Sequence, residues 1–129
     1  MSADRYCEVR AWTEGLAAPL SAEDQTVQSM PDVSPTKWHR AHTSWFFETF
    51  VLGISGVLGP GRDYAPFDPL FAFLFNSYYE QVGERYPRAQ RGVVTRPGVA
   101  EVARYRRHVD EAMLEVLSRP LDPRAAGLI

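Results

Sequence analysis

The sequence predicts an all-α fold, a bundle of helices joined by long connections. Apolar residues recur every three or four positions in several segments, whereas no segment alternates apolar and polar residues and no Asn-Gly pair marks a hairpin. Nothing repeats at a fixed period, which excludes a repeat array. With 129 residues, 45% of them apolar, including 3 Trp, 6 Tyr and 7 Phe, the chain is long enough for one core and too short for two.

Two long helices are expected in the first half of the chain. The first covers residues 4–18 and ends at Pro19. The face that we expect to turn inward has helical spacing and consists of Tyr6, Val9, Thr13, Leu16 and Leu20. Residues 21–24 resemble the capped start of a short helical turn. The second long helix is expected from Ser34 to about Leu52, because the Ser34 side chain offers a capping oxygen and the proline after it fits the first helical position.

Two further helices are expected in the second half. Residues 53–69 contain four glycines and three prolines, so they form a connection. A third helix is expected over residues 68–83, apolar on all sides at its start and therefore covered on most sides. A basic loop, residues 84–97, leads to a fourth helix, whose apolar positions are Val99, Val102, Tyr105, Val109, Met113, Val116 and Leu117. Another helix begins at Pro123 and is not completed before Ile129.

The charge and the cysteine content exclude several classes of protein. The formal net charge is -2, so no general positive field attracts nucleic acid or an anionic membrane, and we expect neither as a partner. The single Cys7 cannot form an internal disulfide, and the charged N-terminus does not resemble a secretion signal. The longest uncharged run, residues 49–61, is too short to span a membrane. We therefore expect a soluble cytoplasmic protein.

The densest group of reactive side chains lies in the expected second helix. His39 and His42 are three residues apart, close enough on a helix to share a metal ion or a water. The competing interpretation is an inward packing stripe, in which His42 is hydrogen-bonded within the core and His39 faces solvent. This stripe consists of Trp38, His42, Trp45 and Phe46. Spacing alone favours the packing interpretation, because such a histidine pair arises easily by chance.

Three other kinds of side chain are candidates for chemistry. His108 is flanked by charged residues on the expected fourth helix, so we expect it to be solvated. Cys7 has no nearby base, and we expect a small buried or half-buried residue rather than a nucleophile. The basic loop contains four guanidinium groups, on Arg85, Arg88, Arg91 and Arg96. Guanidinium groups bind carboxylates through paired hydrogen bonds, so these arginines are candidates for binding an anion. The alternative is a loop that is merely solvated, which would have a similar composition.

Several strings of the sequence resemble one protein family. They are residues 23–32, 34–50 and 74–80, Arg91-Gly92 with Thr95-Arg96-Pro97, and residues 105–110. Together they are similar to the N-terminal DinB-like domain of the iron-dependent sulfoxide synthases of ergothioneine biosynthesis, the hercynine oxygenases. The similarity runs along nearly the whole chain, and the strings keep the family's order. The ovothiol synthases are sister enzymes and the nearest alternative.

This resemblance implies a metal-dependent four-helix bundle, followed in the family by a C-terminal sulfatase-modifying-factor-like domain. There, non-haem iron(II) and oxygen couple a thiol, γ-glutamylcysteine or cysteine, to the imidazole of hercynine. Three histidines hold the iron, one on the helix matching residues 38–47 and two in a later His-x-x-x-His-x-Glu segment. The first maps onto His42, which directly precedes Thr-Ser-Trp-Phe-Phe-Glu. The family's carboxylate-binding arginines map best onto Arg85 and Arg88, with Arg91 as a rival.

The resemblance also implies that residues 1–129 are a truncated DinB-like domain. Ile129 falls where the family's next helix would begin, so we expect the two later histidines and the C-terminal domain, with its catalytic tyrosine, to be missing. One imidazole does not hold iron firmly, and we expect this chain alone to be inactive. Without a closing helix, we expect self-association through an exposed apolar face made of Trp45, Phe46, Phe73 and Tyr78.

Two functions of other classes stay open. A self-contained DinB-like module for metal binding or thiol transfer requires His39, His42 and His108 to converge on one metal. The other function is that of an inert helical interaction domain. It is the default for a small bundle that has one candidate metal-binding residue and lacks the other residues needed to complete the metal site.

Overall fold

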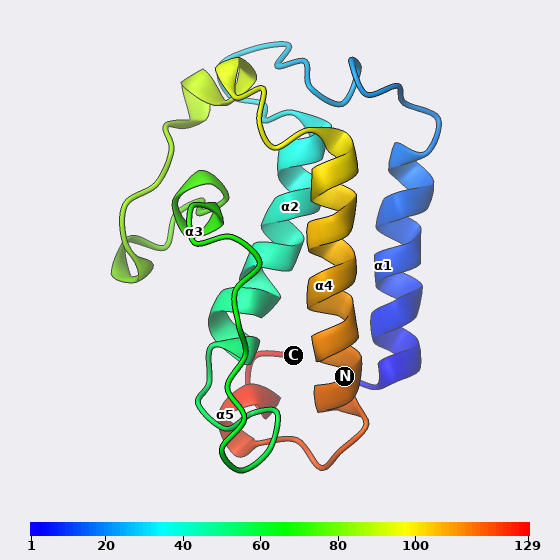
Figure 1. Ribbon diagram of the computed structural model, residues 1–129. Helices are drawn as coiled ribbons and strands as arrows, with labels where there is room; N and C mark the ends of the chain where they lie inside the picture. The colour runs from blue at the N-terminus through cyan, green and yellow to red at the C-terminus, as the bar shows by residue number, and fades with distance from the viewer.

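The computed structural model describes residues 1–129, and all its regular elements are helices (Figure 1). Three long helices lie side by side: α1 (Ala3–Ala17), α2 (Thr36–Phe47) and α4 (Val99–Leu117). Two single turns, α3 (Phe71–Leu74) and α5 (Pro123–Ala126), lie to one side of them. The predicted all-α fold is confirmed, with α1 and α4 close to their expected bounds. None of the helices combines the length and the apolar character needed to cross a bilayer.

The core of the molecule lies between α2 and α4. Their buried apolar side chains follow helical spacing: Trp38, Ala41 and Trp45 on α2, and Val102, Tyr105, Val109, Met113 and Val116 on α4. Phe71 and Phe75 pack against Tyr105 from a third side, with ring centroids 4.9 and 6.3 Å from its own. Burial of these large rings removes much apolar surface from water, and this is the main stabilising contribution in a bundle of this kind.

Helix α1 turns its polar side to the bundle, so its predicted orientation holds for Tyr6, which is buried, but is wrong for the apolar residues that follow. Val9 and Leu16 were expected to face inward, but they are 44% and 66% exposed, and Leu20 also faces solvent. The residues that α1 buries are Tyr6, Arg10 and Ala17, whereas Cys7 is exposed, contrary to the expectation that it is at least half-buried. The physical reason is the surface that α2 and α4 offer to α1, which carries charged and hydroxyl groups rather than apolar ones.

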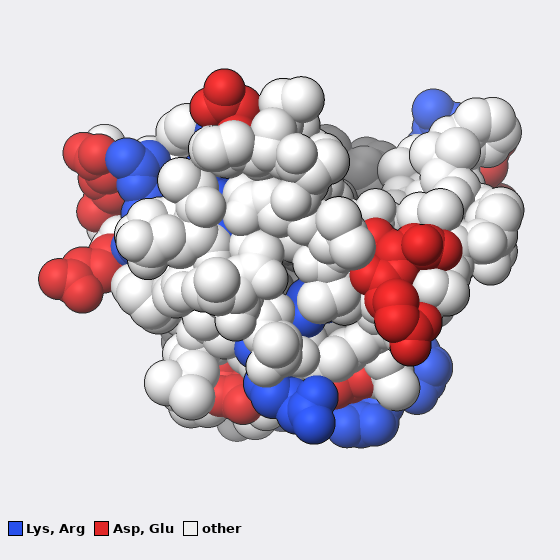
Figure 2. All heavy atoms as spheres, turned by 90° about the horizontal axis from the view of Figure 1, so that it is seen from above, with Lys and Arg blue, Asp and Glu red and all other residues white.

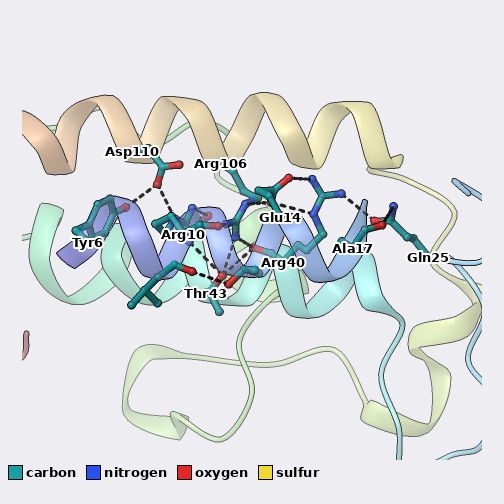
Figure 3. A network of polar contacts seen from close by, with 12 residues as sticks. Tyr6, Arg10, Glu14, Ala17, Gln25, Arg40, Thr43, Arg106 and Asp110 are labelled. Atoms are coloured by element: carbon teal, nitrogen blue, oxygen red, sulfur yellow. Dashed lines mark hydrogen bonds and ion pairs between the residues drawn. The ribbon is translucent and has the colours of Figure 1, made fainter. Parts of the chain in front are cut away.

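A network of ion pairs joins α1 to both core helices (Figure 3). Arg10 on α1 donates from Nε to Asp110 on α4 at 2.7 Å. Glu14 on α1 accepts two hydrogen bonds from Arg40 on α2, at 2.6 and 3.1 Å, and pairs with Arg106 on α4. All three arginines are buried, and buried charges are tolerated only when they are paired in this way.

The two ends of α2 differ from the prediction. Ser34 does not cap the helix, because its hydroxyl accepts a hydrogen bond from Nη1 of Arg91 at 2.8 Å instead. At the other end the helix widens into a π-helical turn, Glu48–Leu52, before it stops at Gly53. The predicted length is therefore confirmed, although the last turn is of a different kind.

The buried carboxylate of Glu48 fixes the connection between α2 and α3. It accepts hydrogen bonds from the hydroxyls of Tyr64 and Tyr105, both at 2.6 Å, and from the Phe67 amide at 3.1 Å. The connection predicted over residues 53–69 is confirmed as irregular chain. Because Tyr105 belongs to α4, these bonds also hold the connection against the core.

The predicted third helix, residues 68–83, is wrong in length, because only α3 forms. Asn76 turns the chain away from the helix. Its side-chain amide donates to the carbonyls of Tyr79 and Gly83 and accepts from the Tyr79 amide. Asparagine side chains compete with helical hydrogen bonds in this manner. The chain then continues through 3-10 turns at Glu80–Val82 and Arg88–Val93.

The exposed apolar face predicted for the bundle is only partly present. Trp45 is 0% exposed, since Tyr79 lies over it with ring centroids 5.5 Å apart, whereas Phe73 and Tyr78 are exposed. Figure 2 shows that the end of the molecule seen from above is largely uncharged at its centre, with basic and acidic groups mainly near its edges and the largest basic group at the lower edge. Another exposed apolar stripe, which includes Val9, Trp12 and Leu16, is on α1.

Candidate functional site

His42 lies in a column of stacked rings on α2. Its imidazole is between Trp38 and Trp45, with ring centroids 4.8 and 5.5 Å away and interplanar angles of 14° and 17°. Its Nδ1 is 2.7 Å from the carbonyl oxygen of Phe75. A carbonyl only accepts, so Nδ1 carries the proton and Nε2 keeps a free lone pair. His42 is therefore hydrogen-bonded within a packed stripe, as its spacing favoured, and it retains a nitrogen that can bind a ligand.

His39 and His42 line one open hollow of about 440 Å³. His39 lies on its exposed rim, as predicted, with its ring edge-on to Trp38 at 5.4 Å. Burial lowers the pKa of both imidazoles, and the positive charge of Arg91 lowers both pKa values further. Both side chains are consequently neutral at pH 7, the form in which imidazole binds metals or accepts a proton.

Arg91 is buried at the junction of α2 and the basic loop. Its Cζ is 3.6 Å from the ring centroid of Trp38, and its guanidinium donates to the Ser34 hydroxyl at 2.8 Å and to the Asn76 carbonyl at 3.3 Å. Its Nε is buried and has no hydrogen-bond partner. Burial and the charges of two neighbouring arginines lower its pKa to about 10, so it stays charged at neutral pH. The sequence indicated a basic residue here but not its burial.

The two predicted substrate-binding arginines both lie beside Tyr78, but their other contacts differ. The Cζ of Arg88 is 4.8 Å from the Tyr78 ring centroid, and its guanidinium takes part in no hydrogen bond or ion pair. The Cζ of Arg85 is 5.7 Å from the same centroid. Arg85 also donates to the Ser77 carbonyl at 2.9 Å and pairs with Glu80 at 3.5 Å. Arg88 is thus free to bind an anion, whereas Arg85 has to share or exchange its contacts.

A second open hollow, of about 450 Å³, adjoins the first. It is lined by Ser77, Tyr78, Arg85, Pro87, Arg88 and Arg91. Four of these, Ser77, Tyr78, Arg88 and Arg91, also line the hollow of the histidines. The structure therefore brings the predicted residues together, with His42 in one hollow, Arg85 in the other and Arg88 in both. A small molecule that binds the arginines through a carboxylate can extend toward the imidazoles.

Two residues that the sequence did not single out hold the basic loop against the bundle. The buried Lys37 donates from Nζ to the Val94 carbonyl at 2.7 Å, and Gln28 accepts from the Gly92 amide at 2.7 Å. A Cβ at Gly92 would lie 2.7 Å from that of Gln28, so glycine is required there. The burial of Lys37 had one signal in the sequence: it lies four residues, about one helical turn, before Ala41 and so on the same face of α2.

The molecule contains no cluster of three or more His, Cys, Asp or Glu side chains that could hold a metal ion. His108 lies against the connection between α2 and α3, with Nε2 3.0 Å from the Ala65 carbonyl oxygen and its ring 5.3 Å from that of Tyr64. It is half-buried rather than solvated as predicted, because this connection folds over it. The convergence of His39, His42 and His108 that a self-contained metal module requires does not occur.

A family model described as the DinB superfamily matches residues 5–126 of the chain. The match begins in α1 and ends in α5, so it includes the residues that line both hollows. No curated protein matches the chain.

Proposed function

The chain belongs to the DinB superfamily, and we propose that it is the N-terminal metal-binding domain of a non-haem iron enzyme of ergothioneine biosynthesis. Such an enzyme couples a thiol, γ-glutamylcysteine or cysteine, to the imidazole of hercynine. The proposal rests on one juxtaposition: the imidazole of His42, with its free Nε2, and the unpaired guanidinium of Arg88 line the same hollow. The strings that resemble the hercynine oxygenases supply His42, in residues 34–50, and Tyr78, in residues 74–80.

His42 fits the role of one iron ligand. The hydrogen bond from Nδ1 to the Phe75 carbonyl selects the tautomer in which Nε2 can bind a metal, an arrangement common among metal-binding histidines. When bound, iron would supply the redox chemistry through which oxygen oxidises the thiol. The chain offers no cluster of three ligands, and a single imidazole makes a weak site. We therefore expect residues 1–129 alone to hold iron(II) loosely and to be inactive.

The arginines fit the carboxylates of the thiol donor. A guanidinium binds a carboxylate through two parallel N–H bonds, and all donors of Arg88 are available. Arg85 lines the adjoining hollow. Two arginines in adjoining hollows favour a donor that has two carboxylates. γ-Glutamylcysteine therefore fits this arrangement better than cysteine does.

Metal titration tests the role of His42. We expect Co²⁺ at high concentration to broaden the NMR signals of the His42 ring, because its Nε2 carries a free lone pair, and His42→Ala to remove this binding. His108→Ala is the matched control, since the Nε2 of His108 faces the Ala65 carbonyl. Binding that persists in His42→Ala would assign the ligand to His39 instead. Metal retained at one equivalent after dialysis would contradict the weak site.

Ligand titration tests the role of the arginines. We expect Arg88→Ala to weaken the binding of γ-glutamylcysteine, measured by calorimetry, by about tenfold or more, the usual effect of losing a hydrogen bond between charged groups. Arg5→Ala, which removes an exposed arginine of α1, is the control and should leave affinity unchanged. Equal affinities of the wild-type protein and Arg88→Ala would refute the proposed carboxylate site.

A second function, that of a helical interaction domain, is favoured by the outward face of α1. Trp12 is 72% exposed, and the exposed Val9, Leu16 and Leu20 continue its stripe at spacings of three and four residues. Contiguous exposed apolar residues of this kind mark interaction surfaces. We propose that any self-association uses this stripe rather than the face predicted around Trp45, which is buried.

A further inference from the structure

Tyr78 contacts both arginines of the proposed carboxylate site, and we propose that its ring is what positions them. The ring centroid is 4.8 Å from Cζ of Arg88 and 5.7 Å from Cζ of Arg85. The face of an aromatic ring carries partial negative charge and attracts a guanidinium. The inference rests on the proposed function and deepens it, because it names the residue that orders the binding groups of the same site.

Arg88 depends on this ring more than Arg85 does. Arg85 is also held by the Ser77 carbonyl and by Glu80. The Arg88 guanidinium takes part in no hydrogen bond or ion pair, so the Tyr78 ring is its cation-binding contact. A long, flexible side chain without such a contact samples many rotamers, and a ligand that binds it has to order it first. The ring therefore pre-organises the guanidinium that the two hollows share.

The side chain of Tyr78 is not needed for the fold. It is 64% exposed, it is not part of the apolar core, and its hydroxyl makes no hydrogen bond. The backbone beside it is fixed independently, through the hydrogen bonds of Arg85 to the Ser77 carbonyl and of Arg91 to the Asn76 carbonyl. A substitution at Tyr78 therefore removes the ring from the site and leaves the surrounding chain in place.

The mobility of Arg88 in the free protein gives the first test. In Tyr78→Leu we expect ¹⁵N relaxation of the Arg88 Nε–H group to report a larger amplitude of motion than in the wild-type protein. Tyr78→Phe should restore the wild-type value, because it keeps the ring and loses only the hydroxyl. Tyr86→Leu is the matched control, since Tyr86 lies in the same loop and packs on Phe73 with no arginine over its ring. Unchanged mobility in Tyr78→Leu would overturn the inference without any reference to a ligand.

Affinity for γ-glutamylcysteine gives the second test. Tyr78→Leu should weaken binding by about two- to fivefold, the effect of losing an exposed cation–π contact, while Tyr78→Phe and Tyr86→Leu bind as the wild-type protein does. In an Arg88→Ala background, Tyr78→Leu should weaken the binding of γ-glutamylcysteine only slightly further, because Arg85 is then the one arginine left beside the ring. An undiminished effect in that background would mean that the ring contacts the ligand itself, which contradicts a positioning role.

The two proposals fail in different ways. If Arg88→Ala weakens binding and Tyr78→Leu does not, the carboxylate site stands and the role of Tyr78 is wrong. If Tyr78→Phe loses as much affinity as Tyr78→Leu, the hydroxyl acts instead of the ring, and the inference is wrong again. If Arg88→Ala binds as tightly as the wild-type protein, the proposed function itself loses its carboxylate site, whatever the mobility of Arg88.

Discussion

Arg10 and Asp110 are 100 residues apart in the sequence and form an ion pair, with 2.7 Å between Nε and Oδ1. The same carboxylate oxygen accepts a hydrogen bond from the Tyr6 hydroxyl at 2.6 Å. One residue of α4 thus holds two residues of α1. Because α1 turns its apolar stripe to solvent, these polar contacts attach it to the core, together with the packing of the buried Tyr6 ring on Phe47.

Removal of the Asp110 carboxylate should loosen α1. We expect Asp110→Ala to lower the free energy of unfolding by about 1–3 kcal/mol, less than for a fully buried pair because Asp110 is partly exposed. The loss arises since Arg10 and the Tyr6 hydroxyl are left without their partner. Urea denaturation followed by circular dichroism measures it. Glu8→Ala, which removes the exposed pair with Arg5, is the control and should cost under about 1 kcal/mol. Equal unfolding midpoints of the two variants would refute the role of this network.

Glu14 should make stability depend on pH in the acid range. Burial disfavours its ionised form, but the hydrogen bond and charge of Arg40 and the charge of Arg106 outweigh burial and hold its pKa below the ordinary 4.5. A carboxyl with a lowered folded-state pKa contributes stability above its unfolded pKa and loses it as the pH falls through the folded value. We therefore expect the difference in unfolding free energy between the wild-type protein and Glu14→Gln to shrink below about pH 4.5. A difference that stays constant from pH 7 to pH 3 would contradict this.

The stripe on α1 should govern self-association without affecting the fold. We expect Trp12→Lys to change the free energy of unfolding by less than about 0.5 kcal/mol, since the side chain is exposed. It should also shift any dimer toward monomer in sedimentation velocity, because a charge is introduced into an apolar contact. Phe73→Lys, in the apolar face that the sequence predicted to be exposed, is the comparison. Dimers lost only in Phe73→Lys would place the contact on that face instead.

Glu80 should compete with anionic ligands for Arg85. Its carboxylate lies 3.5 Å from the Arg85 guanidinium on the surface, so Glu80→Gln should free that guanidinium. We expect γ-glutamylcysteine to bind about two- to fourfold more tightly to the variant, the range of an exposed ion pair. Glu84→Gln removes the same charge from the same loop without breaking an ion pair. A similar gain in Glu84→Gln would show a general field effect rather than competition at Arg85.

The positions of most helices could be predicted because their signals are local. Apolar spacing and the flanking proline and glycine residues depend on neighbours in the sequence, so α4 was predicted with its observed bounds and residues 53–69 as a connection. The third helix was predicted too long because its apolar spacing continues past the residue at which the helix ends. Asn76 ends it through hydrogen bonds to Tyr79 and Gly83, and the apolar pattern around Asn76 carries no sign of them.

Part of the candidate site was also readable from the sequence. The aromatic stripe of the second helix indicated that His42 faces inward and His39 outward, which the structure confirms. The loop composition indicated a group of arginines. Nothing in the sequence indicated that Arg91 is buried against Trp38 or that Arg88 lies over Tyr78 and remains otherwise unpaired, since these contacts join residues that are not neighbours in the sequence.

The sequence by itself determined that the chain is helical, where α1 and α4 begin and end, and which residues are candidates for binding a carboxylate or a metal. Only the tertiary structure decided that α1 turns Arg10 inward and Trp12 outward, and that Arg88 lines both hollows. The physical reason is that periodicity is a property of a single helix. Burial depends on every segment that contacts the helix, and here those segments offer α1 carboxylates and hydroxyls instead of an apolar surface.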